Sequence, residues 1–257
     1  MRLVTWNVNS ITARADRLAA WIDTHRPDVV CLQELKTTTD SFPTQPFTQL
    51  GYDVAAHGQG RWNGVAILSR IGLDNVSRDL PNQPTFEDQL EARAIAATCN
   101  GTRIWSVYVP NGRDSDHPHY AYKLQFLSEL ANLTTSQDQP FAIAGDFNIC
   151  PTDNDIWDLD EWQGTTHTTS AERDALTHLT NTGLADIYPR ALKHDQPFTY
   201  WDYRNLDFPK NRGMRIDLVL ANPTLAHTVT DAWVDRNERK GKGASDHAPL
   251  VVDCEPS

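Results

Sequence analysis

Short apolar runs rich in β-branched residues recur along the whole chain, and they limit the possible folds more than any other feature. Most are too short for helices and are bounded by polar or turn-forming residues, as strands are. The nine clearest runs are residues 3–8, 29–33, 64–69, 94–98, 104–109, 141–144, 216–221, 229–234 and 250–252. Because no repeat and no composition break divides them, we expect a single α/β domain over residues 1–257, with a mixed or antiparallel sheet.

Apolar residues also recur at helical spacing between some of these strands. They do so over residues 11–22, where Ser10 is a candidate N-cap, and over residues 124–133 through four leucines. Thr169 and Glu172 have the spacing of a capping box and predict the start of a third helix. Strands outnumber helices in this pattern, which favours sheets flanked by a few helices.

The charge of the chain gives two opposing indications about nucleic acid. The net charge is −11, which by itself argues against such a partner, because phosphate binding normally requires a basic surface. The basic residues are unevenly distributed, however, since residues 204–215 and 236–243 hold eight of the 23 Lys and Arg side chains and only two acids. A local cationic surface and a pair of solvated loops are both open interpretations of these runs.

The sequence also indicates where the protein acts. No apolar run approaches the roughly 20 residues that span a bilayer, and the first residues lack the long apolar segment of a secretory signal. The four cysteines are far apart and form no C-x-x-C pair, which argues against a disulfide framework and a thiolate zinc site. We therefore expect a cytoplasmic protein that does not bind membranes.

Polar side chains gather at the ends of the predicted strands. Those that directly follow a run, or close one, are Asn7, Glu34, Tyr108, Asp146 and Asn148. Those that begin or precede a run are Asp217, Asp246 and His247. Open α/β sheets build their sites beyond the carboxyl ends of strands, and strands running antiparallel to these would bring the second group to the same edge.

Together these residue types indicate phosphodiester chemistry. Mg²⁺ prefers carboxylate, amide and water oxygens, which Glu34 with help from Asp246 would supply, whereas zinc is less suited to a site with a single His and no thiolate. An Asp beside His247 can orient an imidazole that titrates near neutral pH. Neither a G-x-S-x-G elbow nor a P-loop is present, so metal-assisted phosphodiester hydrolysis is favoured over acyl transfer and nucleotide hydrolysis.

Each motif has a simpler interpretation when it is taken alone. Residues 145–148 fit an ordinary turn, Glu34 fits a surface carboxylate, and residues 245–249 fit a loop with a capping Asp. We interpret residues 153–155 as local structure and not as metal ligands. A catalytic site is indicated because all the other motifs are expected at one edge of the sheet.

The combination of motifs resembles the exonuclease III family of class II abasic-site endonucleases, within the endonuclease/exonuclease/phosphatase superfamily. The matching segments are residues 5–10, 32–36, 108–112, 145–148, 201–204, 215–218 and 245–249. They span almost the whole chain, and the pairing of residues 201–204 with residues 211–217 is the part most specific to the exonuclease III branch. The resemblance implies a four-layered α/β sandwich, in which two mixed, mostly antiparallel β-sheets are flanked by helices.

The resemblance also implies a Mg²⁺ or Mn²⁺ cofactor and assigns roles around it. Glu34 would be the principal metal ligand, aided by Asn7 and Asp246. His247, held by Asp246, would contact the scissile phosphate and stabilise the charged transition state. Asp217 would support His247.

Three further residues take catalytic roles by the same resemblance. Asp146 would orient or deprotonate the attacking water, and Asn148 would fix phosphate oxygens or that water. Tyr108 would donate to the phosphate or assist the leaving oxygen. Which group is the actual general base is left open, because coupled carboxylates share their protons.

The resemblance implies a set of DNA-binding residues as well. Tyr200 and Trp201 would line a pocket for an extruded abasic sugar, although aromatic residues here can also be core. The basic and polar positions expected to contact the DNA backbone are Arg93, Asn111, Lys123, Arg204 and Arg212. His167 is a weaker candidate on a loop that would face DNA.

We therefore expect a DNA repair hydrolase that cuts duplex DNA 5′ to abasic sites and acts as a 3′→5′ exonuclease. Its partner would be double-stranded DNA with abasic sites or 3′ ends, and a monomer would suffice because one chain holds the whole site. Two alternatives stay open: an inositol-phosphate or lipid phosphodiesterase of the same fold, and a DNA- or protein-binding relative without catalysis.

Overall fold

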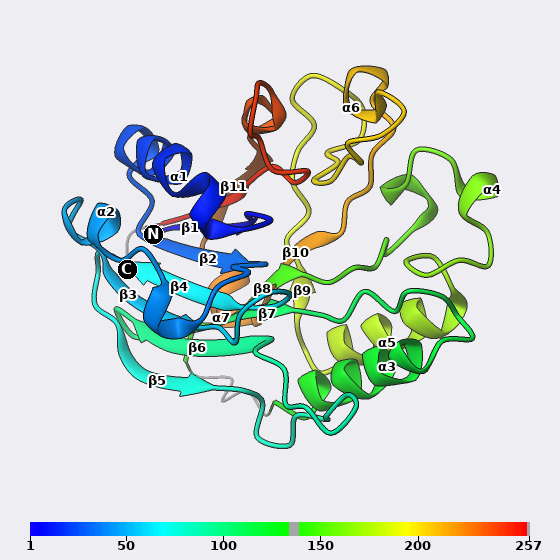
Figure 1. Ribbon diagram of the computed structural model, residues 1–257, viewed down its shortest axis with the longest axis horizontal. Coiled ribbons are helices and arrows are strands. Elements are labelled where there is room, and N and C mark those ends of the chain that lie inside the picture. Colours follow the sequence, from blue (N-terminus) through cyan, green and yellow to red (C-terminus); the bar gives the residue numbers. More distant parts are fainter. Residues whose placement is uncertain (134–138, 256–257) are drawn as a thin grey trace.

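Two six-stranded sheets pack face to face with helices outside them (Figure 1). The computed structural model describes residues 1–133 and 139–255. The helix α1 and the pair α3 and α5, whose bounds follow, lie on opposite sides of the two sheets. The expected α/β sandwich is therefore confirmed. No helix within the described residues combines the length and the apolar character needed to cross a membrane.

The first sheet contains both ends of the described chain. Its strand order is β11 (Val229–Val234), β12 (Leu250–Cys254), β1 (Arg2–Asn7), β2 (Val29–Gln33), β4 (Val65–Ser69) and β3 (Asp53–His57). The β1 and β2 strands are parallel and joined by α1 (Ile11–His25), while the other neighbours are antiparallel. Short helices η1 (Thr39–Ser41) and α2 (Gln45–Thr48) precede β3.

The second sheet has a similar plan. Its strand order is β5 (Asp74–Arg78), β6 (Ala94–Cys99), β7 (Thr102–Tyr108), β8 (Phe141–Asp146), β10 (Asp217–Ala221) and β9 (Ala185–Asp186). Here β7 and β8 are the parallel pair, joined by α3 (Pro118–Ala131), against which α5 (Ser170–Thr180) packs. The remaining short helices are η2 (Asp153–Asp155), α4 (Leu159–Trp162), α6 (Asp207–Lys210), α7 (Pro223–Ala226) and η3 (Arg236–Arg239).

The core explains why the strands are so apolar. Side chains from both sheets, such as Val29, Ile67 and Ile104, form one cluster between the sheets. Separate clusters lie between each sheet and its helices. Strands covered on both faces need apolar residues at almost every position, which is why β2 and β8 are fully buried.

One glycine allows β7 and β8 to approach each other closely beside the polar edge. A Cβ atom on Gly145 would lie 1.9 Å from the carbonyl oxygen of Val107, well inside any allowed contact. Only glycine fits there without moving the strands. Gly145 thereby fixes the position of the next residue, Asp146.

Strand pairing brings the predicted polar residues to one edge. Asp146 is paired with Tyr108 across the parallel ladder and with Asp217 across the antiparallel one. In the other sheet, Asn7 is paired with Gln33, and Glu34, the residue after Gln33, therefore lies at the same edge. His247 precedes β12, and because β12 runs antiparallel to β1, His247 also lies at this edge. The loops that carry α4 and α6 lie beyond this edge (Figure 1).

All nine predicted strands are present, but three further strands were not predicted. They are β3, β5 and β9, which lie at the edges of the sheets. An edge strand is less buried, and β5 in particular is exposed along almost its whole length, so it lacks the apolar signal of the central strands.

The helix predictions need two corrections. The stripe of four leucines over residues 124–133 is displaced from the true buried face of α3, which includes Tyr122, Lys123, Phe126, Leu127 and Leu130. Ser10 precedes α1 but makes no capping hydrogen bond with its side chain. The capping box of Thr169 and Glu172 is confirmed.

Candidate active site

The polar edge forms a cavity of about 350 Å³ between the two sheets and the loops beyond them. Its lining includes nine of the predicted site residues, namely Glu34, Tyr108, Asn111, Asp146, Asn148, Tyr200, Arg204, Asp246 and His247. Of these, Arg204 is highly exposed and lies at the rim. The predicted convergence of strand ends therefore produces an actual concave site.

Asn7 links the two carboxylates at the base of the site. Its Nδ2 atom donates to Glu34 Oε1 at 3.0 Å and to Asp146 Oδ2 at 2.9 Å. Its Oδ1 atom accepts from the backbone N–H of Asn9 at 2.9 Å, which fixes the orientation of the amide. Asn7 is fully buried, so these bonds hold both carboxylates in place.

Asp217 orients His247, and the sequence neighbour Asp246 does not. His247 Nδ1 lies 2.8 Å from Asp217 Oδ2, whereas Asp246 Oδ1 accepts from Asn9 Nδ2 at 3.0 Å. The expectation that Asp246 holds His247 was therefore wrong. Burial alone would lower the pKa of His247, but the charge and hydrogen bond of Asp217, with Asp146 nearby, raise it to about 10. His247 is consequently an imidazolium at neutral pH.

Asp146 is placed to exchange a proton near neutral pH. Its Oδ2 atom lies 3.8 Å from His247 Nε2, and its Oδ1 atom accepts from the backbone N–H of Asn148 at 2.9 Å. Burial, partly offset by the charge of His247, raises the pKa of Asp146 to about 7, and Asp217 contributes in the same direction. Such a pKa suits a general base at physiological pH.

Glu34 is held in a strained backbone conformation at the end of β2. Its φ of 53° lies in the left-handed region, which side chains of this size seldom adopt. The backbone N–H of Ser10 donates to its carbonyl oxygen at 2.7 Å, which anchors the turn to the start of α1. The turn aims the carboxylate at the cavity, where Tyr108 Oη donates to it at 2.9 Å and Lys36 Nζ lies 2.9 Å from it.

The ionisation of Glu34 and Tyr108 follows from these contacts. Burial alone would raise the pKa of Glu34, but Lys36 and Asn7 outweigh it and the pKa is lowered. The pKa of Tyr108 is raised well above its usual value by burial and by the negative charge of Glu34. Tyr108 therefore remains a hydrogen-bond donor.

A metal ion fits the acidic end of the cavity. One ligand atom each from Glu34, Asp146 and His247 lies within 4.8 Å of the other two. His247 is protonated and does not bind a metal in that state, so the two carboxylates are the ligands of this group, and carboxylates suit a hard ion such as Mg²⁺ or Mn²⁺. Asp246, which was expected to assist, is hydrogen-bonded to Asn9 and does not belong to this group of three.

Asn148 and Asn111 are tied together beside the carboxylates. Asn111 Nδ2 donates to Asn148 Oδ1 at 3.2 Å, and Asn148 Nδ2 donates to the carbonyl oxygen of Val109 at 3.0 Å. Both side chains line the cavity. Polar groups held in this way can bind phosphate oxygens without first reorganising.

Three residues that were expected to contact DNA are buried instead. Lys123 has no exposed surface, Arg93 is 4% exposed, and Trp201 is 1% exposed. The ammonium of Lys123 donates to the carbonyl oxygens of Asn148 at 2.7 Å and Asn111 at 3.2 Å, and it is paired with Glu172. These side chains therefore support the site from inside, and the structure offers no surface through which they contact DNA.

The buried side chains of Arg93 and Trp201 also make specific contacts in the interior. Arg93 is paired with Glu91, donates to the carbonyl oxygen of Tyr108 at 3.2 Å and lies 4.9 Å from the Tyr108 ring centroid. Trp201 packs edge-on against Phe208. Tyr200, in contrast, lines the cavity and lies 5.0 Å from the His247 ring.

The two predicted arginines from the basic run 204–215 have partners of their own, and of these two Arg204 lines the cavity while Arg212 does not. Arg204 is highly exposed and is paired with Asp202 at 2.6 Å. Arg212 lies with its guanidinium 4.6 Å from the ring centroid of Trp157. Neither contact buries the charge, so both arginines remain available to phosphate groups.

His167 is more prominent in the structure than in the sequence analysis. It lines the cavity, has a φ of 87°, and its Nδ1 atom has no hydrogen-bond partner among the described residues. Burial, together with the charge of Lys123, lowers its pKa to about 4, so the ring is neutral at pH 7. Trp162 and Arg113 line the same side. No local motif distinguishes these three positions from ordinary loop residues.

The loop that carries Asn111 is sensitive to pH through His119. The backbone N–H of Gly112 donates to His119 Nδ1 at 3.1 Å, which requires an unprotonated ring. Burial, reinforced by Arg93 and Arg113, lowers the pKa of His119 to about 4, whereas an unfolded His has a pKa of about 6.5. Between these values the unfolded chain takes up the proton and the folded chain does not, so stability is lost as the pH falls.

We expect His119 to account for about 2 kcal/mol of the stability lost between pH 6.5 and pH 4. Urea unfolding across this range measures the loss, and a His119→Asn variant should show a shallower dependence on pH. His178→Asn, at an exposed position of α5, is the matched control and should follow the wild type. Equal pH dependence in wild type and His119→Asn would contradict this role.

Comparisons with known proteins identify the family of the chain. The model of the endonuclease/exonuclease/phosphatase family matches residues 4–247. Exodeoxyribonuclease III of Haemophilus influenzae is 31% identical to the chain, over 97% of the chain and 98% of that protein. Among solved structures, a 3′-5′ exonuclease from Neisseria meningitidis has a TM-score of 0.93 at 34% identity, and an AP endonuclease from Archaeoglobus fulgidus has 0.93 at 31%. Each covers the whole of both chains.

The family match extends over nearly the entire chain and includes every strand that carries a catalytic candidate. The chain therefore belongs to the endonuclease/exonuclease/phosphatase family, and within that family to the exonuclease III group.

Proposed function

We propose that this protein is a divalent-metal-dependent DNA repair phosphodiesterase, which cuts duplex DNA 5′ to abasic sites and removes nucleotides from 3′ ends. The observation that carries the proposal is the group formed by Asp146, the Asp217–His247 pair and Glu34 at one end of the cavity. The relatives support the substrate class. Those of known structure include an AP endonuclease and a Neisseria protein, which is described as a 3′-5′ exonuclease and, bound to a product DNA hairpin, as a 3′ phosphatase.

The residues around the cavity divide the chemical work. Asp146, with its pKa near 7, accepts the proton of the attacking water. His247, held as an imidazolium by Asp217, stabilises the negative charge that develops on the phosphate oxygens. Asn148 and Asn111 position those oxygens, and Tyr108 donates a hydrogen bond to the Glu34 carboxylate.

A metal ion would be held mainly by Glu34, with Asp146 beside it. Its chemistry there would be that of a Lewis acid, which lowers the energy of the charged phosphate. Asn7 keeps the Glu34 carboxylate oriented for this task through its 3.0 Å hydrogen bond. We propose Mg²⁺ or Mn²⁺, since the donor oxygens are those of carboxylates.

Glu34→Gln should weaken metal binding by at least about 100-fold, because even changes next to a ligand cost 10–100-fold. Calorimetric titration with Mn²⁺ measures this directly, without reference to activity. Glu87→Gln removes an exposed carboxylate and is the matched control, with unchanged affinity. Unaltered Mn²⁺ binding by Glu34→Gln would rule out Glu34 as the principal ligand.

Three labelled substrates test the proposed activity with Mg²⁺, with Mn²⁺ and with EDTA. They are a duplex with one abasic-site analogue, an intact duplex with a recessed 3′ end, and a soluble inositol phosphate. We expect metal-dependent cutting 5′ to the lesion and shortening of the recessed strand, with the inositol phosphate unchanged. Phosphate release from the inositol ester without DNA cleavage would instead establish the same-fold alternative.

We further propose that the protein acts as a monomer, because every residue of the cavity comes from one chain. Arg204 lies at the rim, where DNA backbone would approach, and Tyr200 forms part of the wall. Arg212, which lies against Trp157 outside the cavity lining, would be a further contact to the backbone. An abasic sugar turned into the cavity would lie against Tyr200 and beside His247.

A further inference from the structure

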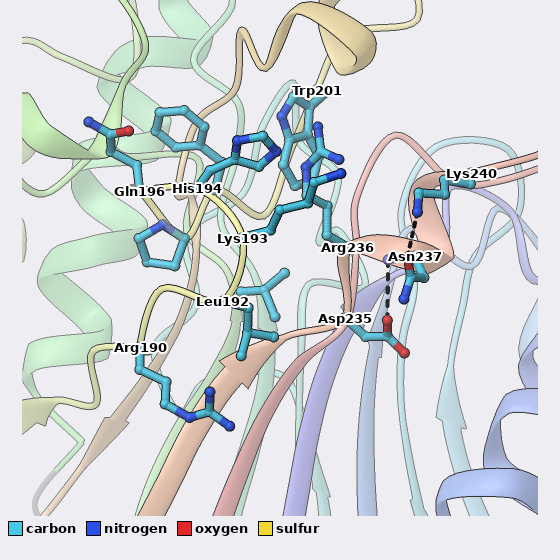
Figure 2. Close-up of a pocket in the computed structure, with 13 residues that line it drawn as sticks. Arg190, Leu192, Lys193, His194, Gln196, Trp201, Asp235, Arg236, Asn237 and Lys240 are labelled. Atoms are coloured by element: carbon cyan, nitrogen blue, oxygen red, sulfur yellow. Dashed lines mark hydrogen bonds between the residues drawn. The ribbon is translucent and has the colours of Figure 1, made fainter.

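A second cavity lies behind the wall of the active site, and we call it the rear cavity. It has a volume of about 170 Å³ and is lined by residues 190–198 before the Tyr200–Trp201 segment, by Trp201 itself, and by residues 234–240 around η3 (Figure 2). Tyr200 lines the active-site cavity while Trp201 lines the rear cavity, since successive residues of an extended segment point to opposite sides. The two cavities therefore share one wall.

Basic side chains dominate the lining of the rear cavity. They are Arg190, Lys193, His194, Arg236 and Lys240. The single acid in the lining is Asp235, which already accepts hydrogen bonds from Trp21 Nε1 at 2.9 Å and from the backbone N–H of Asn237. For a chain with a net charge of −11, this is a marked local excess of positive charge.

Much of this charge is not neutralised. Arg190 is paired with Asp231 at 2.6 Å, but neither Lys193 nor Arg236 forms an ion pair with any residue in the ranges 1–133 and 139–255. The pKa of His194 is lowered, first by burial and then by the charges of Arg236 and Lys193. Three cationic or titratable groups thus lie close enough to repel one another.

Two buried nitrogens at this cavity lack hydrogen-bond partners. Within the described residues they are Arg236 Nε, which is a donor, and His194 Nε2, which is a donor in its Nε2–H tautomer or when the ring is protonated. Buried polar groups without partners are uncommon, and a group bound from outside the chain would satisfy them. The His194 ring and the Arg236 guanidinium lie next to each other below Trp201 (Figure 2).

Arg236 is also rigid, which favours a binding role. Its guanidinium carbon lies 4.1 Å from the ring centroid of Phe208 and 5.3 Å from that of Trp201. One of its terminal nitrogens donates to the carbonyl oxygen of Phe208 at 2.9 Å. A guanidinium held between aromatic rings loses little freedom when it binds an anion.

We propose that the rear cavity binds a phosphate group, carried either by inorganic phosphate or by a mononucleotide. A phosphate offers up to two negative charges and several acceptor oxygens, which matches the two unpaired cations, the unpartnered Arg236 Nε donor and His194 Nε2 in its Nε2–H tautomer. Pro197, Phe198 and the half-exposed Leu192 add an apolar side against which a sugar or base can pack. The proposal concerns binding and no chemical reaction, and it does not depend on the proposed nuclease activity.

Titration calorimetry and NMR in EDTA test this site, with inorganic phosphate and 2′-deoxyadenosine 5′-monophosphate as probes. Lys193→Glu reverses an exposed charge at the rim and should not disturb folding, whereas His194→Gln identifies the ring resonance of His194 by its loss. Lys242→Gln is the matched control, because Lys242 is exposed nearby but does not line the cavity. The active site is intact in all variants, so any phosphate that it binds is a constant background.

We expect both probes to shift the His194 resonance in the wild type and in Lys242→Gln. In Lys193→Glu the affinity should fall by at least about tenfold, the effect of losing one charged hydrogen bond. If the mononucleotide binds more tightly than phosphate, its base or sugar contacts the apolar side of the cavity. If the two bind equally, inorganic phosphate is the ligand. Nuclease activity, measured separately, should be the same in Lys193→Glu and His194→Gln as in the wild type.

Two results would overturn the proposal. One is equal affinity for both probes in the wild type and in Lys193→Glu, with the His194 resonance unmoved. The other is a larger shift with an acidic peptide than with either probe, which would make the rear cavity a site for protein. Either result leaves the cleavage experiments on DNA unaffected.

Discussion

Asp146→Asn should lower kcat by about 10²–10⁴-fold, the usual contribution of a general base. The change replaces a carboxylate that can accept a proton with an amide that cannot. Asn7 Nδ2 donates to Oδ2 and the backbone N–H of Asn148 donates to Oδ1, so the single oxygen of an asparagine keeps one of these two bonds. Burial raises the pKa of Asp146 and makes its charge costly, so removing the charge should offset part of the lost hydrogen bond and the change in stability should be small.

The measurement is single-turnover cleavage of a duplex with an abasic-site analogue, together with the dissociation constant of the same duplex. Affinity should change only by a few fold, because the substitution removes water activation and hardly any binding. Asp16→Asn makes the same chemical change on an exposed face of α1 and should leave both quantities unchanged. Turnover near the wild-type rate in Asp146→Asn would transfer the role of base to another group.

The position of the site was predictable because the ends of strands can be recognised in the sequence. Polar residues such as Asn7, Glu34 and Asp146 directly follow apolar runs, and the antiparallel direction of β10 and β12 brings Asp217 and His247 to them. Only the approximate positions of the strands were needed for this inference. Small errors at the strand boundaries therefore did not matter.

The partners within the site were not predictable to the same degree. Asp246 lies next to His247 in sequence, yet Asp217 binds its ring, because the register of β10 against β8 places Asp217 opposite Asp146. Register between distant strands depends on packing across the whole sheet. A local motif carries no information about it.

The sequence does indicate that Lys123 is buried, but the spacing of the four leucines favoured a different helical face. In α3 the buried positions include Tyr122, Phe126 and Leu127 as well as Lys123, at the spacing of a single helical face. A lysine on such a face requires a buried partner. The partner is Glu172, the last residue of the capping box that begins α5.

Lys123→Met should destabilise the protein by about 3–5 kcal/mol, the usual effect of removing one member of a buried ion pair. The Lys123 and Glu172 side chains have no exposed surface, so Glu172 would be left as an isolated charge in the interior. Chemical denaturation at pH 7 measures the loss. Lys123→Met combined with Glu172→Gln should be more stable than Lys123→Met alone, because the amide retains acceptor capacity without the charge.

Measurements of cleavage activity distinguish the contribution of Lys123 to the active site from its contribution to the stability of the fold. In both variants the carbonyl oxygens of Asn111 and Asn148 lose their common donor, so cleavage should stay reduced even where stability partly recovers. The alternative role of Lys123, direct binding to DNA, predicts a different result. Removing a cation that neutralises one phosphate would reduce the slope of log affinity against log salt by about 0.9.

We expect no change in that slope for Lys123→Met, because a side chain without exposed surface releases no counterions when DNA binds. Lys210→Met is the matched comparison, since Lys210 is exposed in the basic run 204–215. It should reduce the slope if that run contacts DNA, and it should leave the unfolding free energy unchanged. A reduced slope in Lys123→Met, with normal stability, would show that the lysine leaves the interior to bind the substrate.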